Sequence, residues 1–400
     1  TQTGRSAYEN SYTLNSVQAF AASGGASPLE VANPDLATPE QVTSLEVGYR
    51  GKFENLIVDF SAYHSTYNDF LSTEVVIAPL YGNVSDGTPP GLPLPVSAIA
   101  ILLGLLIDHI VGEPRRWHPL VGFGNTASKL EQTANPSSAA DGKLRGLLCW
   151  MLLVLTPASA VAVLVAQLSG LALLVVNCLV VYFVVGLKSL AEHGRNVAAP
   201  LLAGDLEGAR QQIAMMVSRD TANLSEQQVA SATCESVLEN GSDAVFAALF
   251  WFLVLGAPGA ILYRGANTLD AMWGYKTERY RRFGWAAARI DDLLNWLPAR
   301  LTALSYGLVG NFSSALKCAR QQGGLTDSPN AGYVMAAGAG ALSISMGGAA
   351  IYHGEEHQRP VFGVGPLAQA ADIERAIALV QRTSVLWIVL ALAFNGLLIT

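Results

Sequence analysis

Long runs of apolar residues constrain this 400-residue chain more than any other feature of its sequence. A transmembrane helix needs about 20 consecutive, mostly apolar residues. Charged residues make up only 14% of the chain, against about 25% in an average soluble domain. We therefore expect an all-α polytopic membrane protein with four or five transmembrane helices and amphipathic extramembrane helices. The candidate runs are Leu92–Val111, Leu147–Leu168, Leu171–Leu187, Ala244–Tyr263 and Ser384–Ile399.

The basic residues between these runs leave the topology open. The stretches 112–146, 188–243 and 264–300 carry five, four and seven Lys or Arg residues. A hairpin at Ser169-Gly170 places the first two stretches on one side, and the third should be cytoplasmic as well. These counts conflict if Ala244–Tyr263 crosses the membrane completely. Either this run is re-entrant or one of the other runs does not span.

The first 90 residues have a different character, with three basic and ten acidic side chains. The composition changes near Pro89-Pro90-Gly91, so we expect one segment at 1–90 and a membrane domain at 91–400. Apolar and polar residues alternate in Ser44–Arg50 and in part of Leu56–Ser65, which predicts a β-hairpin. Residues 1–85 resemble the late barrel strands of TonB-dependent outer-membrane receptors.

A receptor barrel must close on itself in lipid, which so short a piece cannot do. We therefore expect residues 1–90 to be a fused or disordered fragment, with a genuine accessory extension as the alternative. No signal peptide is recognisable at the start of the sequence, and we expect the native N-terminus to be missing.

Two further patterns limit the class of protein. No basic stripe is left uncompensated, so we expect no nucleic-acid partner. The cysteines lack the CxxC spacing of a zinc site, and we expect small buried thiols. They are Cys149, Cys178, Cys234 and Cys318.

The first polar cluster, Asp108–Pro119, directly follows an apolar run. Interfacial anchoring accounts for Arg116 and Trp117. It does not account for Asp108, because an acid within an apolar run is costly and is usually functional.

The second cluster joins Ser218–Thr221 to three acids, Glu235, Glu239 and Asp243. The acids recur every four residues and so lie along one helical face. Like charges at this spacing repel, which favours a positive partner such as Mg²⁺, Arg or Lys. The alternative is a solvated face of an interfacial helix. Ser225 and Gln228 predict a capping box at the start of this helix.

The third cluster extends from Tyr263 to Asn295 and is rich in Arg, Asp and Asn. Arginine forks match phosphate and carboxylate oxygens. Positive-inside topology explains Arg281 and Arg282 equally well, so both interpretations stay open.

The fourth cluster comprises Asp327–Tyr333, Gly347-Gly348 and Tyr352–Gly354. Taken alone, it is ordinary turn chemistry. Together, the four clusters indicate either a membrane enzyme acting on phosphorylated substrates or a transporter.

In order and spacing these clusters resemble the motifs of the adenosylcobinamide-phosphate synthases, the membrane proteins of cobalamin biosynthesis. The resemblance covers residues 91–400. The residues that carry it are Leu106–Asp108 with Gly112–Gly122; Ser218–Thr221, Glu235–Val237 and Glu239-Asn240; Tyr263–Asp270 with Gly274-Tyr275; and Ser328–Gly332 with Tyr352–Gly354.

The resemblance implies an ATP-dependent amide ligase in the inner (cytoplasmic) membrane, with Mg²⁺ as a second cofactor. Its substrates would be adenosylcobyric acid and aminopropanol or aminopropanol phosphate. Its partners would be membrane lipid and other membrane enzymes of cobalamin assembly. The sequence has no Walker A motif, so ATP must be bound in another way.

Within this resemblance we assign roles as hypotheses. Asp108, Glu113, His118, Asp270 and His353 are candidate catalytic residues. Arg115, Arg219, Thr221, Arg264, Asn267, Lys276 and Asn330 are candidates for binding substrate or phosphate. Asp220, Glu235, Glu239 and Asp243 are candidate metal ligands, because hard cations prefer oxygen. The alternatives are a corrinoid transporter, an outer-membrane receptor or a membrane scaffold without chemistry.

Overall fold

Two compact units, Thr1–Gly87 and Thr88–Thr400, make up the chain in the computed structural model. The structure describes residues 41–53, 56–68, 94–114, 118–136, 141–217, 219–348, 350–352 and 355–399. In the first unit, β1 (Gln41–Phe53) pairs antiparallel with β2 (Leu56–Asn68). The register places Val47 opposite Ala62. The predicted hairpin is confirmed, and both strands are longer than the alternation indicated.

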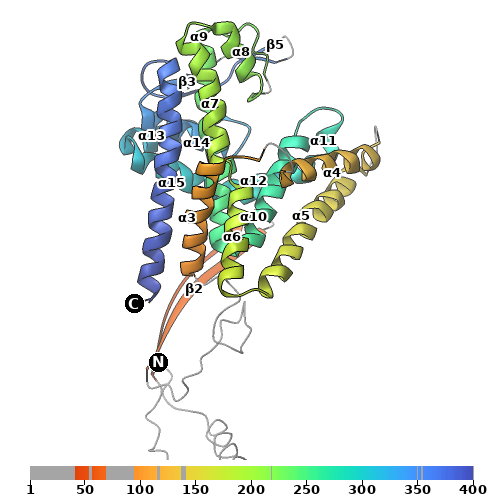
Figure 1. The fold of residues 1–400 in the computed structure, drawn as a ribbon, viewed down its shortest axis with the longest axis vertical. Coiled ribbons are helices and arrows are strands. Elements are labelled where there is room, and N and C mark those ends of the chain that lie inside the picture. The colour runs from red at the N-terminus through yellow and green to blue at the C-terminus, as the bar shows by residue number, and fades with distance from the viewer. Residues whose placement is uncertain are drawn as a thin grey trace, which may run out of the picture. The chain divides into compact units, whose positions relative to one another are not determined.

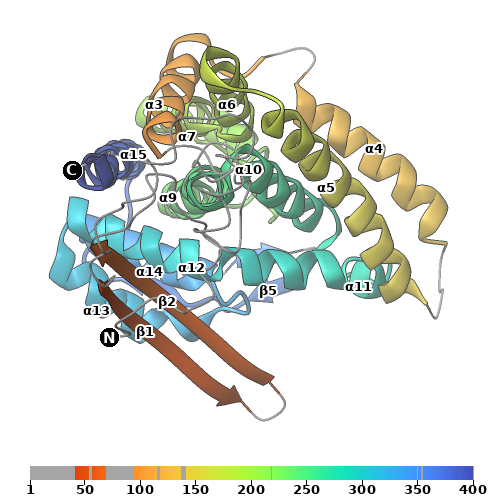
Figure 2. The ribbon, with the colours of Figure 1, turned by 90° about the horizontal axis from the view of Figure 1, so that it is seen from below.

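The second unit is a bundle of helices, as Figures 1 and 2 show. Four helical segments of the described residues are long and apolar enough to cross a membrane. The predicted polytopic all-α fold is therefore confirmed. The helices over the predicted apolar runs are α3 (Leu94–Val111), α5 (Gly142–Ala166), α6 (Gly170–Val184), α10 (Ala247–Trp273) and α15 (Ala370–Ile399).

Shorter elements surround the apolar helices. The helices are α4 (Pro119–Ala134), α7 (Leu187–Leu202), α8 (Leu206–Ile213), α9 (Glu226–Gly241), α11 (Tyr280–Phe283), α12 (Trp285–Val309), α13 (Phe312–Gln322) and α14 (Ala331–Leu342). A π-helical turn, η1 (Ser242–Phe246), joins α9 to α10, and η2 (Gly323–Leu325) follows α13. Two antiparallel pairs complete the unit: β3 (Ser345–Gly347) with β6 (Val361–Gly363), and β4 (Ala350–Tyr352) with β5 (Glu355–His357).

Helix α9 begins with the predicted capping box. The Ser225 hydroxyl accepts from the Gln228 amide, and the Gln228 side chain accepts from the Ser225 amide. Almost every residue from Val229 to Leu238 is buried. The solvated interfacial face, one of our two interpretations of the acidic series, is therefore wrong for Glu235, whereas Glu239 and Asp243 are half-buried. The Glu235 carboxylate faces protein, so it needs a proton, a cation or hydrogen-bond donors.

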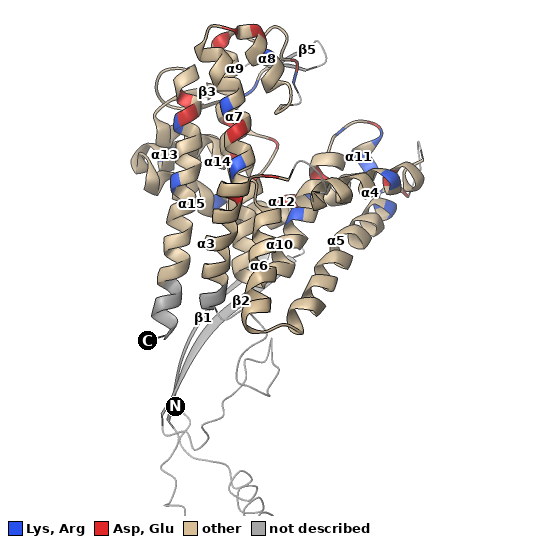
Figure 3. Ribbon diagram, viewed as in Figure 1, with Lys and Arg blue, Asp and Glu red and all other residues tan. Residues whose placement is uncertain are grey.

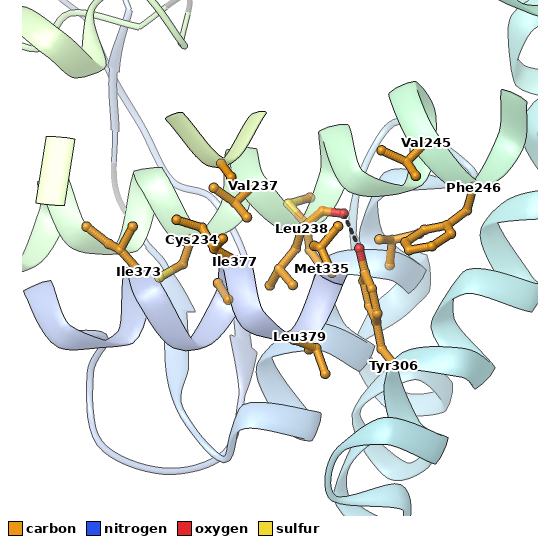
Figure 4. Close-up of a cluster of buried hydrophobic side chains, with 14 of the residues drawn as sticks. Cys234, Val237, Leu238, Val245, Phe246, Tyr306, Met335, Ile373, Ile377 and Leu379 are labelled. Carbon is orange, nitrogen blue, oxygen red and sulfur yellow. Dashed lines mark hydrogen bonds between the residues drawn. The ribbon is translucent and has the colours of Figure 1, made fainter. Parts of the chain in front are cut away.

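The core packs α9 against α12, α14 and α15, which lie far from it in sequence. Figure 4 shows Leu238 of α9 beside Met335 of α14 and Tyr306 of α12, and Ile377 on the neighbouring helix α15. The Tyr306 hydroxyl donates to the Leu238 carbonyl oxygen over 2.9 Å. All four cysteines are buried and free, as predicted for small buried thiols.

Helix α10 reverses direction at Gly256. This residue has φ 68° and ψ −159°, a conformation that interrupts a helix and that glycine adopts most readily. The reversal brings Gly259 against Trp251, so that a Cβ at Gly259 would overlap the Trp251 carbonyl oxygen. In Figure 1, α9 and α11 flank this segment and both lie toward the upper end of the bundle. Of the two sequence-based alternatives, the structure therefore favours the re-entrant one.

Charged side chains gather at one end of the bundle. Figure 3 shows Lys, Arg, Asp and Glu in the upper part of the second unit, whereas the α5–α6 turn and the lower helices lack them. The turn contains Leu168, Ser169 and Gly170. A bundle built in this way has one polar end and one apolar end.

Candidate functional site

A cavity of about 250 Å³ lies at the polar end of the second unit. The end of α3, the loop after it, α6, α7, α9 and α10 all contribute to its walls. Three of the four sequence clusters meet here. Their polar side chains on the walls are Asp108, Glu113, His118, Ser236, Asn240 and Arg264.

Asp108 joins α3 to the start of α7. Its Oδ2 accepts from the backbone amide of Lys188 over 2.8 Å, and its side chain is 2% exposed. A carboxylate at a helix N-terminus satisfies a free amide and complements the helix dipole. The Tyr182 hydroxyl donates to the Gly112 carbonyl oxygen nearby, over 2.8 Å. Asp108 is thus a wall residue of the cavity that also positions α7.

His118 presents one ring nitrogen to the cavity's polar groups. Its Nδ1 accepts from the Leu120 amide over 3.2 Å and so caps α4. This bond leaves the proton of the neutral ring on Nε2, which is 3.9 Å from Oε1 of Glu113. Burial lowers the pKa of His118; the Glu113 carboxylate opposes this shift and the Arg264 guanidinium adds to it. The neutral imidazole is therefore the favoured form.

Arg264 of α10 brings a positive charge to the cavity wall. Its Nη1 lies 3.4 Å from Oδ1 of Asn267, and its buried Nε has no hydrogen-bond partner. No carboxylate of a described residue lies within the 4.0 Å of an ion pair with it. A guanidinium without a counter-ion at a cavity wall suits an anionic group of a ligand.

Glu235 has its positive partners within the protein. Its Oε2 lies 3.0 Å from Arg219 and 2.8 Å from Arg359, and its Oε1 accepts from Ser231 over 3.1 Å. Its side chain is 3% exposed. The structure thus places arginine, one of the three partners that the acidic series predicted, beside this carboxylate. These contacts already occupy both carboxylate oxygens.

A second acidic group lies near Arg264. Asn295 donates to Oδ1 of Asp243 over 2.8 Å, and Asn267 lies 3.4 Å from Oδ1 of Asp291. Burial raises the pKa of Asp291 well above its usual range, and the carboxylates of Asp243 and Asp270 raise it further. Asp243, Asp270 and Asp291 have no Lys, Arg or His nitrogen of a described residue within 4.0 Å.

The predicted metal ligands do not form one cluster. Asp220 is exposed and accepts from the Ala222 amide over 3.0 Å. Among the described residues, no three His, Cys, Asp or Glu side chains are placed to hold a metal ion together. Glu239 and Asp243 are one turn apart, are half-buried and form no ion pair with a described residue. Two such carboxylates fit a Mg²⁺ ion whose other ligands are water and phosphate.

Other predicted site residues lie away from the cavity. Thr221 is buried at the start of the turn before α9. Lys276 is 81% exposed and pairs with Asp327 over 2.7 Å. Asn330 accepts from Arg300 over 2.7 Å and donates to the Asp292 carbonyl oxygen over 2.8 Å. The predicted roles of Arg115 and His353 fall outside the described residues.

The sequence analysis also missed polar residues of this region. Tyr182, Ser189 and His193 line the cavity, and Arg359 neutralises Glu235. The spacing of Ser189 and His193, one turn apart on α7, was the available signal. No local pattern connects Arg359 with α9, because the two are 124 residues apart.

The fold and the cavity define a polytopic helical membrane protein with a charged pocket at one end of its bundle. The family model of the CobD/Cbib protein matches residues 101–380, and the chain belongs to this family. No solved structure matches the chain. The family match starts after the β-hairpin, so the receptor resemblance of residues 1–85 has no support from the comparisons.

Three relatives illustrate the range of similarity. The cobalamin biosynthesis protein CobD of Stutzerimonas stutzeri is 53% identical over 298 residues, 74% of this chain and 97% of the relative. CobD of Chromobacterium violaceum is 55% identical over 304 residues, covering 74% and 96%. CobD of Mycobacterium tuberculosis H37Rv is 38% identical over 291 residues, covering 70% and 90%.

Proposed function

We propose that this protein acts in cobalamin biosynthesis as an ATP-dependent amide ligase. It joins a propionate carboxylate of adenosylcobyric acid to aminopropanol or its phosphate ester, giving adenosylcobinamide or its phosphate. Membership of the CobD/Cbib family and the names of its relatives support the pathway. The charged residues on the cavity walls support chemistry rather than a purely structural role.

The observation that carries the proposal is the meeting of separate motifs at one cavity. Asp108 and His118 come from the first motif, Asn240 from the second and Arg264 from the third. These residues are distant in sequence and share no structural task. A cavity at the end of a membrane bundle with a few convergent polar groups is a typical ligand site.

The reaction needs activation of a carboxylate and then attack by an amine. A carboxylate oxygen takes the γ-phosphoryl group of ATP and ADP leaves; the amine nitrogen then bonds to the acyl carbon and phosphate leaves. Arg264 is suited to binding an anionic group of either substrate, because its guanidinium has no carboxylate of a described residue as partner. Glu113, which is half-exposed at the cavity, is placed to accept the proton that the amine loses.

Glu239 and Asp243, on the turns of α9 and η1 next to the cavity residue Asn240, would hold Mg²⁺ through their carboxylate oxygens. When bound, the ion supplies neutralisation of the phosphate charge. Glu235 is left to hold Arg219 and Arg359 in place. The proposal places the protein in the inner membrane, beside other membrane enzymes of cobalamin assembly.

The proposal is tested by a ligation assay on the full chain in lipid nanodiscs. Mg²⁺-ATP, adenosylcobyric acid and aminopropanol phosphate are supplied, and the amide product is detected by mass. Arg264→Gln should lower kcat/KM at least tenfold, whereas Glu207→Gln, an exposed control on α8, should leave it unchanged. Folded protein that forms no product and leaves ATP intact would contradict the ligase. Movement of corrinoid across proteoliposomes would then support a transporter.

A further inference from the structure

The most unusual chemistry outside the cavity walls is a set of buried oxygen atoms without partners. Tyr263 is 0% exposed and Asn295 is 2% exposed. The Tyr263 hydroxyl and Oδ1 of Asn295 have no hydrogen-bond partner. Most buried polar atoms in proteins are hydrogen-bonded, so two unsatisfied atoms in one place require an explanation.

A buried carboxylate accompanies these atoms. Asp291 is 8% exposed and lies four residues before Asn295 on α12, so both side chains share one helical face. Tyr263, on α10, experiences the charges of Asp291 and Asp243 and the amide of Asn295. Asp291 has no basic nitrogen of a described residue within ion-pair distance. The three oxygen-bearing side chains thus form a buried acceptor group whose carboxylate has no ion-pair partner among the described residues.

This acceptor group is linked to the cavity wall through two side chains. Arg264 stands on the cavity wall and lies 3.4 Å from Asn267, and Asn267 lies 3.4 Å from Asp291. The cavity wall therefore carries a positive group, and the acceptor group lies next to it, reached through Asn267. Such a pair is complementary to a small molecule that carries a cationic group close to an anionic or polar group.

We infer that Asp291, Asn295 and Tyr263 bind the primary ammonium group of the amine substrate. An ammonium group has three N–H donors and no acceptor. The acceptor group offers three oxygen acceptors, one of which is a carboxylate. A metal ion fits less well, because Asp291 is the one acidic side chain of the three and Tyr263 and Asn295 are neutral. This inference rests on the proposed function for the identity of the amine.

The test measures binding of 1-amino-2-propanol alone to the full chain in nanodiscs by calorimetry, without ATP or corrinoid. Asp291→Asn should weaken binding at least tenfold, and Tyr263→Phe, which removes a single oxygen, should weaken it about threefold or more. Asp292→Asn is the matched control. Its carboxylate is 30% exposed and lies 3.8 Å from Arg289, and this variant should bind within twofold of the wild type. Propane-1,2-diol, which lacks the nitrogen, should not bind.

Kinetics provide a second readout in the ligation assay. Asp291→Asn and Tyr263→Phe should raise KM for the amine while KM for adenosylcobyric acid stays within twofold. If the amine fails to bind the wild type, or binds both variants as tightly, the inference is wrong. Loss of Mg²⁺ binding rather than amine binding in Asp291→Asn would identify a metal site instead.

The two proposals fail separately. Amine binding that depends on Asp291, in a protein that forms no amide, would contradict the ligase proposal and support the ammonium-binding site. Amide formation with an unchanged KM for the amine in both variants would support the ligase proposal and contradict the ammonium-binding site.

Discussion

At the scale of single residues, Glu235 shows how a structural contact can resemble a metal site in sequence. Its spacing to Glu239 and Asp243 suggested shared ligands, yet Arg219 and Arg359 already neutralise it. Both arginines are largely buried, at 9% and 22% exposed. A buried charge that loses its partner is costly, so the role of Glu235 can be separated from that of Glu239.

Glu235→Gln should destabilise the protein by about 3–5 kcal/mol, because the buried Arg219 guanidinium loses its counter-charge and Arg359 loses one ion pair. The measurement is the unfolding temperature in nanodiscs. Glu239→Gln is the control, since Glu239 forms no ion pair with a described residue. It should shift the unfolding temperature little and raise the Mg²⁺ concentration needed for activity. Equal shifts of the unfolding temperature in both variants would contradict the different roles assigned to Glu235 and Glu239.

The lowered pKa of His118 predicts that the stability of the folded protein depends on pH. Burial lowers its pKa in the folded protein, so the unfolded chain binds the proton more readily. The resulting stabilisation is complete above the unfolded pKa of about 6.5 and is lost as pH falls through the folded pKa. His118→Asn keeps a residue suited to the helix cap and removes the titration. Wild-type unfolding temperatures should fall more steeply from pH 7 to pH 5 than those of the variant. Parallel curves would show that His118 does not contribute.

At the scale of elements, the reversal of α10 depends on close packing at Gly259. A methyl group there would meet the Trp251 carbonyl oxygen and the Leu255 side chain. Gly259→Ala should therefore destabilise the protein by about 1–3 kcal/mol, as overpacking does. Gly122→Ala on α4 is the matched control, since a Cβ there meets nothing within 4 Å. It should be neutral or stabilising by about 0.5–1 kcal/mol. A Gly259→Ala protein as stable as the control would contradict the tight hairpin.

Local sequence signals predicted where the helices lie better than they predicted which other elements cover them. The capping box at Ser225 and Gln228 and the apolar runs depend on neighbouring residues, and the structure has them where expected. The burial of α9 was not predictable in this way, because α12, α14 and α15 cover it from far along the chain. For the same reason the sequence left two alternatives for α10. The glycines and proline at 256–259 permit a reversal, but only packing of the second arm decides it.

The same limit applies to the candidate site. Sequence clusters named Asp108, Glu113, His118 and Arg264, and the structure brings them to one cavity. They could not show that Lys276 and Asn330 lie elsewhere, since proximity between clusters depends on the tertiary fold.

At the scale of the whole membrane unit, a re-entrant α10 would remove the conflict between the loop charges. With α10 entering and leaving on one side, the described basic residues of 112–146, 188–243 and 264–300 would share the polar end of the bundle (Figure 3). The α5–α6 turn at the other end carries no charge. Loops rich in Lys and Arg stay in the cytoplasm. We therefore expect the cavity to open toward the cytoplasm, the compartment that supplies ATP.

This orientation is tested by single cysteines and a membrane-impermeant maleimide. Ser169→Cys, in the exposed α5–α6 turn, should react in cells whose outer membrane alone is permeable. Glu207→Cys and Asp327→Cys, both exposed at the polar end, should react only after the inner membrane is opened. The four native cysteines are buried, which keeps the background low. Labelling of Glu207→Cys in intact spheroplasts with protection of Ser169→Cys would reverse the orientation. Labelling at Glu207→Cys but not at Asp327→Cys would show that α10 crosses the membrane.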